Sequence, residues 1–204
     1  MPLAEVELVL GVDEVPKNVR QLIADAQARV EEFSDRHAAT VPAFVPSDFE
    51  IVYRGLEAIE ESRLAAGRRF IEWGSGIGII TCLADSLGFD AVGIEIESQL
   101  VDMAEAFAEA HGIGVQFARG SFLPPGAEPH LEMPDDVAWL ATSGADGYEE
   151  LDVEPDEFDV VFAYPWPGEE QVIFDLFADC AAVGALLLTY HGQEGLRLQR
   201  KVGR

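Results

Sequence analysis

Residues 69–87 read RFIEWGSGIGIITCLADSL, and this stretch decides the fold. Its first five residues favour a strand, its glycine-rich centre favours a tight turn, and the apolar segment from residue 79 favours a helix. Gly74, Gly76 and Gly78 allow the backbone to turn sharply and to approach a ligand that a Cβ atom would block. The stretch therefore predicts a strand, a ligand-binding turn and a helix in direct succession.

Strands and helices continue to alternate after this unit. Apolar runs predict further strands at residues 91–96, 115–118, 158–164 and 185–190, and helical periodicity predicts helices at residues 98–111 and 171–182. Strands that alternate with helices are typical of a parallel sheet covered on both faces. The expected fold class is therefore α/β, with a doubly wound, mostly parallel sheet and helices on both faces.

Two helices are predicted before the first of these strands. Residues 16–36 begin with Pro16, which suits a first helical turn, and carry apolar residues three and four positions apart. Ser47 and Glu50 have the spacing of a capping box for a second helix that runs to about residue 66. We interpret residues 1–66 as an N-terminal helical extension and residues 67–204 as the main domain.

A long segment at residues 121–157 interrupts the alternation. It contains five prolines and many acidic residues. Loops without regular structure rarely exceed about 12 to 15 residues unless they are functional or disordered. We interpret the segment as an acidic insertion over the mouth of the sheet, with a short helix expected at residues 135–140.

The charge balance is strongly acidic, because 38 Asp and Glu outnumber 13 Lys and Arg and leave a net charge of −25. Such a field repels phosphate backbones and anionic membrane surfaces, so neither nucleic acid nor membrane is an expected partner. Both a cationic partner and a salt-rich habitat fit this balance, and charge alone does not separate them.

Cysteine content and apolar runs limit the cellular setting. The two cysteines, Cys82 and Cys180, provide neither a disulfide framework nor the paired ligands of a zinc site, and no metal is expected. No apolar run approaches the roughly 18 residues that a membrane span needs, and the start of the chain lacks the pattern of a secretory signal. We expect a soluble, cytoplasmic protein.

Glu95 ends the second strand of the main domain, 21 residues after Gly74. A carboxylate at this spacing can accept both hydroxyl protons of an adenosine ribose. A dinucleotide site would have its third glycine where this chain has Ile79. Glu72 also places a negative charge before the turn, which opposes a pyrophosphate and suits a cationic ligand.

The sequences EWGSGIG and VGIEIE resemble the class I S-adenosylmethionine-dependent methyltransferases, whose first motif is acid-x-Gly-x-Gly-x-Gly and whose second strand ends in an acid. The resemblance covers roughly residues 68–190. It implies a Rossmann-like fold, S-adenosylmethionine as cofactor, and Ser121 in place of the usual Asp near the adenine. The cofactor-binding residues that it implies are Glu72, Gly74, Ser75, Gly76, Gly78, Glu95, Ile96, Ser121 and Phe122.

The strand at residues 158–164 ends in YPWP, at the edge where open α/β sheets bind ligands. This segment resembles the Asn/Asp-Pro-Pro-aromatic motif of methyltransferases that act on nitrogen, with Tyr164 at the polar position and Trp166 at the aromatic one. Aromatic faces stabilise cationic amines by about 0.5 to 2 kcal/mol. Tyr164 and Trp166 are therefore the predicted catalytic residues, and the predicted acceptor is a nitrogen of a basic protein or small amine.

Simpler interpretations of the same residues also stand. YPWP is also consistent with a rigid turn whose Trp166 fills the core. Trp73 either flanks the cofactor or packs beneath it, and packing is favoured. His191 follows the strand at residues 185–190 and is a further candidate proton acceptor.

The family usually ends its sheet with a sixth strand and an antiparallel seventh, but only 14 residues follow Tyr190. Either the sheet is short, or residues 5–12 and part of the acidic insertion supply replacement strands, or the chain is truncated. Ser121 and the missing final strands indicate one alternative function, a catalytically silent methyltransferase fold that binds proteins. A second alternative, an oxidoreductase that binds NAD or FAD, is disfavoured by Ile79 and Glu72. The sequence does not indicate an oligomeric state.

Overall fold

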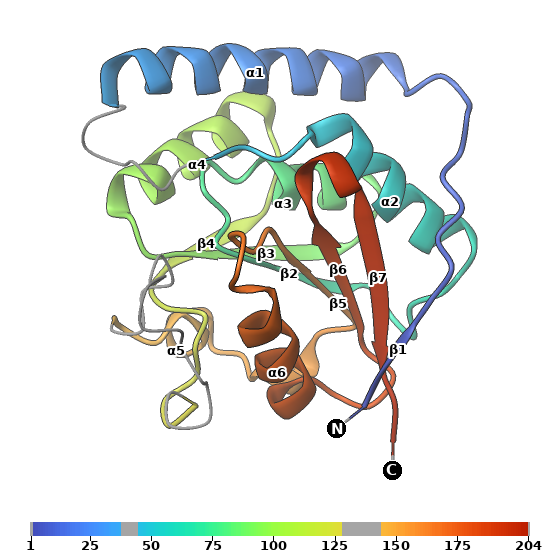
Figure 1. The fold of residues 1–204 in the computed structure, drawn as a ribbon. Helices are drawn as coiled ribbons and strands as arrows, with labels where there is room; N and C mark the ends of the chain where they lie inside the picture. Colours follow the sequence, from blue (N-terminus) through green and yellow to red (C-terminus); the bar gives the residue numbers. More distant parts are fainter. Residues whose placement is uncertain (1, 38–44, 128–143, 204) are drawn as a thin grey trace.

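The computed structural model describes residues 2–37, 45–127 and 144–203, which fold around a seven-stranded sheet in the order β1-β7-β6-β5-β2-β3-β4 (Figure 1). The strands are β1 Leu3–Glu5, β2 Arg69–Trp73, β3 Asp90–Glu95, β4 Gln116–Arg119, β5 Val160–Ala163, β6 Leu186–Tyr190 and β7 Leu196–Lys201. Strands β2 to β6 pair in parallel, and β7 is antiparallel to both β6 and β1. The predicted doubly wound, mostly parallel sheet is confirmed.

The chain reverses its direction across the sheet between β2 and β5. From β2 it proceeds outward through β3 to β4, and it then returns to the other side of β2 to add β5 and β6. Trp73 at the end of β2 pairs in register with Ala163 at the end of β5. The glycine turn and the YPWP segment therefore leave the same edge of the sheet from neighbouring strands, at the position where open α/β sheets bind ligands.

Helices cover both faces of the sheet, with α1 to α4 on one side and α5 and α6 on the other (Figure 1). The helices are α1 Lys17–His37, α2 Phe49–Glu61, α3 Ile79–Ser86, α4 Ser98–His111, α5 Gly147–Leu151 and α6 Glu170–Cys180. Successive side chains of a strand point to opposite faces. In β2, Phe70 accordingly joins the core under α1 to α4, whereas Ile71 joins the core under α5 and α6.

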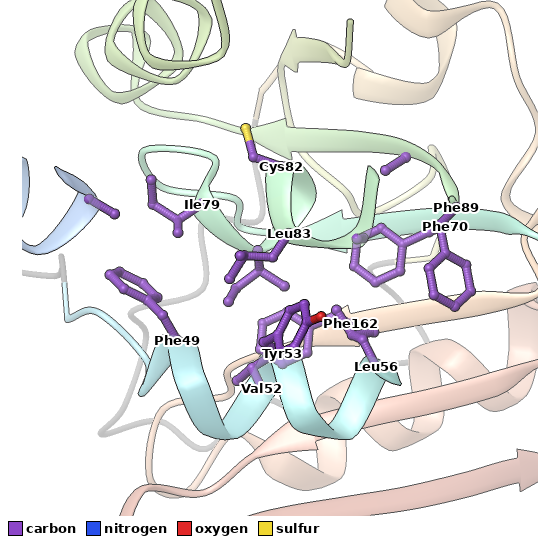
Figure 2. Packing of buried hydrophobic residues seen from close by; sticks show 14 of the residues in the cluster. Phe49, Val52, Tyr53, Leu56, Phe70, Ile79, Cys82, Leu83, Phe89 and Phe162 are labelled. Carbon is purple, nitrogen blue, oxygen red and sulfur yellow. The ribbon is translucent and has the colours of Figure 1, made fainter. Parts of the chain in front are cut away.

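The two N-terminal helices share a core with the sheet. Figure 2 shows the apolar side of α2, with Phe49 and Val52, directed toward Ile79 and Leu83 of α3. Helix α1 lies across α3 and α4 (Figure 1), and Arg29 of α1 lies 5.5 Å from the ring centre of a phenylalanine on α4. Both helices therefore support the strand and helix that flank the glycine turn.

The sheet ends differently from what was expected, because an antiparallel strand does follow Tyr190. A short 3-10 turn, Gly192–Glu194, reverses the chain after β6, and its closing bond runs from the His191 amide to the Gly195 oxygen at 2.8 Å. This turn leaves room for an antiparallel β7 within the 14 residues that follow Tyr190. Strand β1 pairs with β7 and forms this edge of the sheet. Of the residues 5–12 that were expected to supply a replacement strand, only Glu5 belongs to β1.

Helix α2 also differs from its predicted bounds. It begins after Asp48, whose side chain accepts a hydrogen bond from the Ile51 amide at 3.1 Å, so the cap is not Ser47. It ends at Glu61 rather than near residue 66, and Arg63 then adopts a left-handed backbone with φ +51°. The capping-box prediction is wrong by one residue, because Ser47 and Asp48 are both good cap residues.

The described ends of the acidic insertion are joined to each other. Ser121 donates its amide to the Ala145 oxygen at 2.7 Å, and its own oxygen accepts the Gly147 amide at 3.1 Å. Helix α5 follows directly and packs against β3 and β4. The helix expected at residues 135–140 lies outside the described residues. No helix in the described ranges is long and apolar enough to cross a membrane.

Candidate active site

A cavity of about 440 Å³ lies at the carboxyl ends of β2, β3 and β5. Its volume falls within the range of about 300 to 1,000 Å³ that is typical of small-molecule sites. Its walls come from four regions: the glycine turn, the segments after β3 and β4, the YPWP segment with the start of α6, and residues 45–49 before α2. Segments far apart in the sequence therefore meet at the switch point of the sheet.

The cavity brings together most of the residues singled out from the sequence. Those that line it are Glu72, Gly74, Ser75, Gly76, Glu95, Ile96, Ser121, Phe122, Tyr164 and Trp166. Gly78 is not among the lining residues. The binding and catalytic roles of the lining residues stay predictions. The predicted cofactor-binding residues on this list and the predicted catalytic residues nevertheless line the same cavity.

Hydrogen bonds to β3 fix the start of the glycine turn. The amides of Gly74 and Ser75 both donate to the Ile94 oxygen at 2.9 Å, and the Gly76 amide donates to the Glu95 carboxylate at 2.8 Å. Gly74 has φ +72°, and a Cβ atom added to it would meet no atom within 4 Å. The turn therefore leaves open space beside Gly74, on the cavity.

Gly78 is needed for close packing rather than for open space beside the cavity. A Cβ atom there would lie 2.6 Å from a ring carbon of Phe117 and 2.8 Å from the Cβ of Ala104. These residues belong to β4 and α4, so the missing side chain lets α3 pack closely against both. The structure places Gly78 in the packing between elements rather than on the cavity wall.

Glu72 holds the first turn of α3. Its Oε2 accepts hydrogen bonds from the Thr81 amide at 2.8 Å and from the Thr81 hydroxyl at 2.6 Å. A carboxylate at a helix N-terminus is favoured by the exposed amides and by the helix dipole. Burial nevertheless raises the pKa of Glu72 to about 8; the Thr81 bonds oppose this rise and the charge of Glu95 adds to it.

Glu95 connects the glycine turn to the start of α4. Its Oε1 accepts the Glu97 amide at 2.9 Å, while its Oε2 accepts the Gly76 amide. Burial raises the pKa of Glu95, and the backbone bonds from Glu97, Gly76 and Ile96 oppose that rise. Each carboxylate oxygen can accept more than one hydrogen bond. Glu95 is therefore held rigidly on the cavity wall with acceptor capacity to spare.

The segment after β4 forms a further wall. The Ser121 hydroxyl oxygen accepts the Leu123 amide at 3.1 Å, which leaves its own proton available for donation. The Phe122 ring stacks on Trp73, with ring centres 5.3 Å apart and planes 4° apart. Trp73 therefore packs against Phe122 and also lines the cavity.

The YPWP wall is supported from β6. The Tyr164 ring packs edge to face on Tyr190, with centres 4.9 Å apart. Next to them, the His191 ring nitrogen Nε2 lies 2.8 Å from the Thr189 hydroxyl, and burial lowers the pKa of His191. His191 does not line the cavity, so the structure does not place this candidate proton acceptor at the site.

Sequence reasoning missed three contributors to the site. Thr81 binds Glu72, residues 45–47 and Phe49 form one wall, and buried Glu169 lines the cavity at the start of α6. A Pro-Gly pair at residues 167–168 was the available signal for Glu169, because this pair predicts a type II turn that brings its flanking residues together. The other contacts join distant segments and leave no local pattern.

The residues of the cavity fit a cationic nucleoside better than a dinucleotide. The described residues that line the cavity include no Lys or Arg to pair with a pyrophosphate, and Glu95 and Ser121 offer groups that suit a ribose and a base. Within the described ranges, no group of three or more His, Cys, Asp or Glu residues is arranged to hold a metal ion.

A glycine turn after β2, an acid at the end of β3 and an antiparallel strand near one edge of the sheet together define the α/β fold of S-adenosylmethionine-dependent methyltransferases. Three solved structures share this fold. An RNA methyltransferase from Salinibacter ruber, in complex with S-adenosyl-L-homocysteine, is 19% identical with a TM-score of 0.53, over 78% of this chain and 95% of that one.

The other two structures are similarly distant in sequence. A methyltransferase from Geobacter sulfurreducens is 12% identical, with a TM-score of 0.54, over 94% of this chain and 93% of that one. An O-methyltransferase from Bacillus cereus, in complex with S-adenosyl-L-homocysteine, is 16% identical, with a TM-score of 0.51, over 87% of this chain and 67% of that one. At these identities the likeness establishes the fold.

Sequence comparison finds a short match. Ribosomal protein L11 methyltransferase from Thermus thermophilus is 30% identical over 79 residues, which are 39% of this chain and 31% of the relative. The match thus spans about a third of the curated relative. No protein-family model matches the chain.

The two glycines with similar φ angles provide a matched test of the turn. Replacing either Gly74 or Gly78 by Ala costs about 1 kcal/mol of backbone strain, because both have positive φ. Gly78→Ala must in addition displace Phe117 or Ala104. We expect its free energy of unfolding, measured by urea denaturation, to fall at least about 1 kcal/mol further than that of Gly74→Ala. Equal losses would contradict the packing role of Gly78.

The raised pKa of Glu72 predicts a pH dependence of stability. Because this pKa rises from 4.5 to about 8 on folding, the folded protein binds more protons than the unfolded chain between these values. The contribution of Glu72 to the free energy of unfolding must therefore fall as the pH rises through this window. We expect wild type to lose at least about 1 kcal/mol relative to Glu72→Gln between pH 5.5 and 8. Parallel curves for the two proteins would contradict a raised pKa.

Proposed function

We propose that this protein is an S-adenosylmethionine-dependent methyltransferase that methylates a nitrogen of a cationic acceptor, either a basic protein or a small amine. The observation that carries the proposal is one cavity at the switch point of the sheet. It joins the glycine turn and Glu95 with the aromatic YPWP segment. A cofactor side and an acceptor side are thus adjacent, as transfer between two bound molecules requires.

The cofactor side can hold a nucleoside with an amino-acid tail. Glu95 would accept the ribose hydroxyls, Ser121 would donate to the base, and the open backbone at Gly74 would admit the tail next to Glu72. The fold is shared with proteins crystallised with S-adenosyl-L-homocysteine, which supports this assignment. When bound, S-adenosylmethionine would supply a methyl group whose bonding electron pair stays with sulfur, so the acceptor nitrogen must provide its own lone pair.

The chain itself then contributes alignment and electrostatics. An amine that arrives as an ammonium ion must first lose a proton to water, because a protonated nitrogen has no lone pair. Positive charge develops on the nitrogen as the new N–C bond forms. The faces of Tyr164 and Trp166 stabilise that charge, and a cavity that excludes water strengthens the interaction.

Two observations favour a basic protein or amine over other acceptors. The net charge of −25 repels RNA and attracts cations. The curated relative carries the name of a methyltransferase for a ribosomal protein, which is the protein class of acceptor. The structurally similar proteins include an RNA methyltransferase and an O-methyltransferase, so the fold alone does not identify the methyl acceptor.

Profiling with a labelled methyl donor tests the acceptor. We expect label from the donor to reach basic proteins or amines in a cell extract when wild-type protein is added. Trp166→Ala should reduce this labelling at least about tenfold, since the acceptor loses its aromatic contact. Trp166→Phe should retain most of it, because an aromatic face remains.

Calorimetric titration with S-adenosyl-L-homocysteine is the folding control for both variants, and its affinity should stay within about twofold of wild type. Label on nucleic acid, a carboxylate or a catechol would contradict the amine proposal. Full labelling by Trp166→Ala would contradict the role of the aromatic wall. Firm binding without any label would favour the silent fold that binds proteins.

A further inference from the structure

Within the described part of the chain, Glu72 accepts hydrogen bonds from one residue, Thr81. The Thr81 amide and the Thr81 hydroxyl both donate to Oε2, at 2.8 and 2.6 Å. An ionised carboxylate only accepts hydrogen bonds, and O–H bonds to such a group are typically about 2.5 to 2.7 Å long. Both bonds therefore favour the charged form of Glu72.

Thr81 acts on the site from outside the cavity. It is fully buried and does not line the cavity, whereas Glu72 does. Because the backbone and the side chain of one residue both donate to Oε2, they fix the position of this oxygen. Thr81 is therefore placed to set the direction of the Glu72 carboxylate without touching a ligand.

The surroundings of Glu72 oppose its ionisation. Burial raises the pKa of Glu72 to about 8, and the charge of Glu95 on β3 adds to this rise. Cys82 on α3 also interacts with Glu72, but burial raises the pKa of that thiol to about 12, so it stays neutral. On β5 the residue in register with Glu72 is the apolar Phe162. The described residues that line the cavity include no Lys, Arg or His, so they supply no cation.

We propose that Thr81 is a positioning residue for the cofactor: its hydroxyl holds the Glu72 carboxylate charged and directed at the ammonium group of the cofactor's amino-acid tail. This inference rests on the proposed function, because it takes S-adenosylmethionine as the ligand. The ammonium group supplies the positive charge that the described lining residues lack.

Binding of the ammonium group must depend on pH. An opposite charge close to a carboxylate stabilises its ionised form, so the bound ammonium lowers the pKa of Glu72 and a proton is released. Affinity for a ligand with the amino group must therefore rise with pH between the pKa of the bound state and that of the free state. A ligand without the amino group gains nothing from this change.

Two ligands that differ in one group test this proposal without turnover. S-adenosyl-L-homocysteine carries the amino group, and its deamino analogue carries hydrogen in that place. In calorimetric titrations at neutral pH, wild type should bind the amine at least about tenfold more tightly than the analogue. Thr81→Val keeps the shape and loses the hydroxyl, so it should reduce this ratio at least about fivefold. Thr81→Ser keeps the hydroxyl and should stay within about twofold of the wild-type ratio.

The pH profile of the same ratio separates a charge effect from a loss of packing. In wild type the ratio should rise at least about fivefold between about pH 6 and pH 8, as Glu72 loses its proton. Thr81→Val should shift this rise to higher pH, because one of the two bonds that oppose the raised pKa is lost. Thr81→Ala lacks the same hydroxyl and should give the same shift.

Ser86→Ala is the matched control. Its hydroxyl lies at the other end of α3, donates to the Leu83 oxygen at 2.7 Å and does not line the cavity. Loss of this hydroxyl should change neither the ratio nor its pH profile.

The outcomes separate this inference from the proposed function. Failure of wild type to bind S-adenosyl-L-homocysteine would contradict the proposed function itself. Firm binding without a preference for the amine would contradict only the roles of Glu72 and Thr81. A wild-type ratio and pH profile in Thr81→Val and Thr81→Ala would overturn the positioning role. An equal loss of affinity for both ligands in these variants would assign Thr81 a structural role and overturn the proposal as well.

Discussion

The hydrogen bond from the Gly76 amide to the Glu95 carboxylate is the contact on which the site depends. It joins the turn after β2 to the end of β3, while the Ile94 oxygen holds the amides of Gly74 and Ser75. These bonds use polar groups that parallel strands leave at their carboxyl ends. They hold the glycine turn in the wall of the cavity and fix the position of the Glu95 carboxylate. Glu72 secures the other end of the turn through Thr81.

Local periodicity was sufficient to predict most of the fold. The unit at residues 69–87 and the long helices have strong apolar patterns, and the structure confirms them. The strand β7 reads LRLQRK and has only two apolar residues, so its place depends on pairing with β6. Strand β1 has three residues and forms because β7 offers a free edge. Such long-range pairing leaves little trace in a single sequence.

The candidate site also combines residues that local spacing predicts with residues that only long-range packing brings together. Spacing along the strand-turn-helix unit and to the end of the next strand predicted Glu72, Gly74, Gly76 and Glu95 for one site, and all four line the cavity. The cavity wall at residues 45–49 and the contact of Gly78 with Phe117 depend on the packing of α2 and β4. The acidic composition also has a local counterpart: the buried acidic residues Glu72, Glu95 and Glu169 all line the cavity.

The central claim is that the cavity binds a nucleoside with an amino-acid tail through Glu95, and calorimetric titration with S-adenosyl-L-homocysteine and NAD tests it most directly. The account predicts binding of the homocysteine derivative and none of NAD. Glu95→Ala should weaken that binding by about 1 to 3 kcal/mol, because a charged acceptor is lost. Asp90→Asn, at the exposed opposite end of β3, should leave it unchanged. Tight NAD binding, or wild-type affinity in Glu95→Ala, would contradict the account.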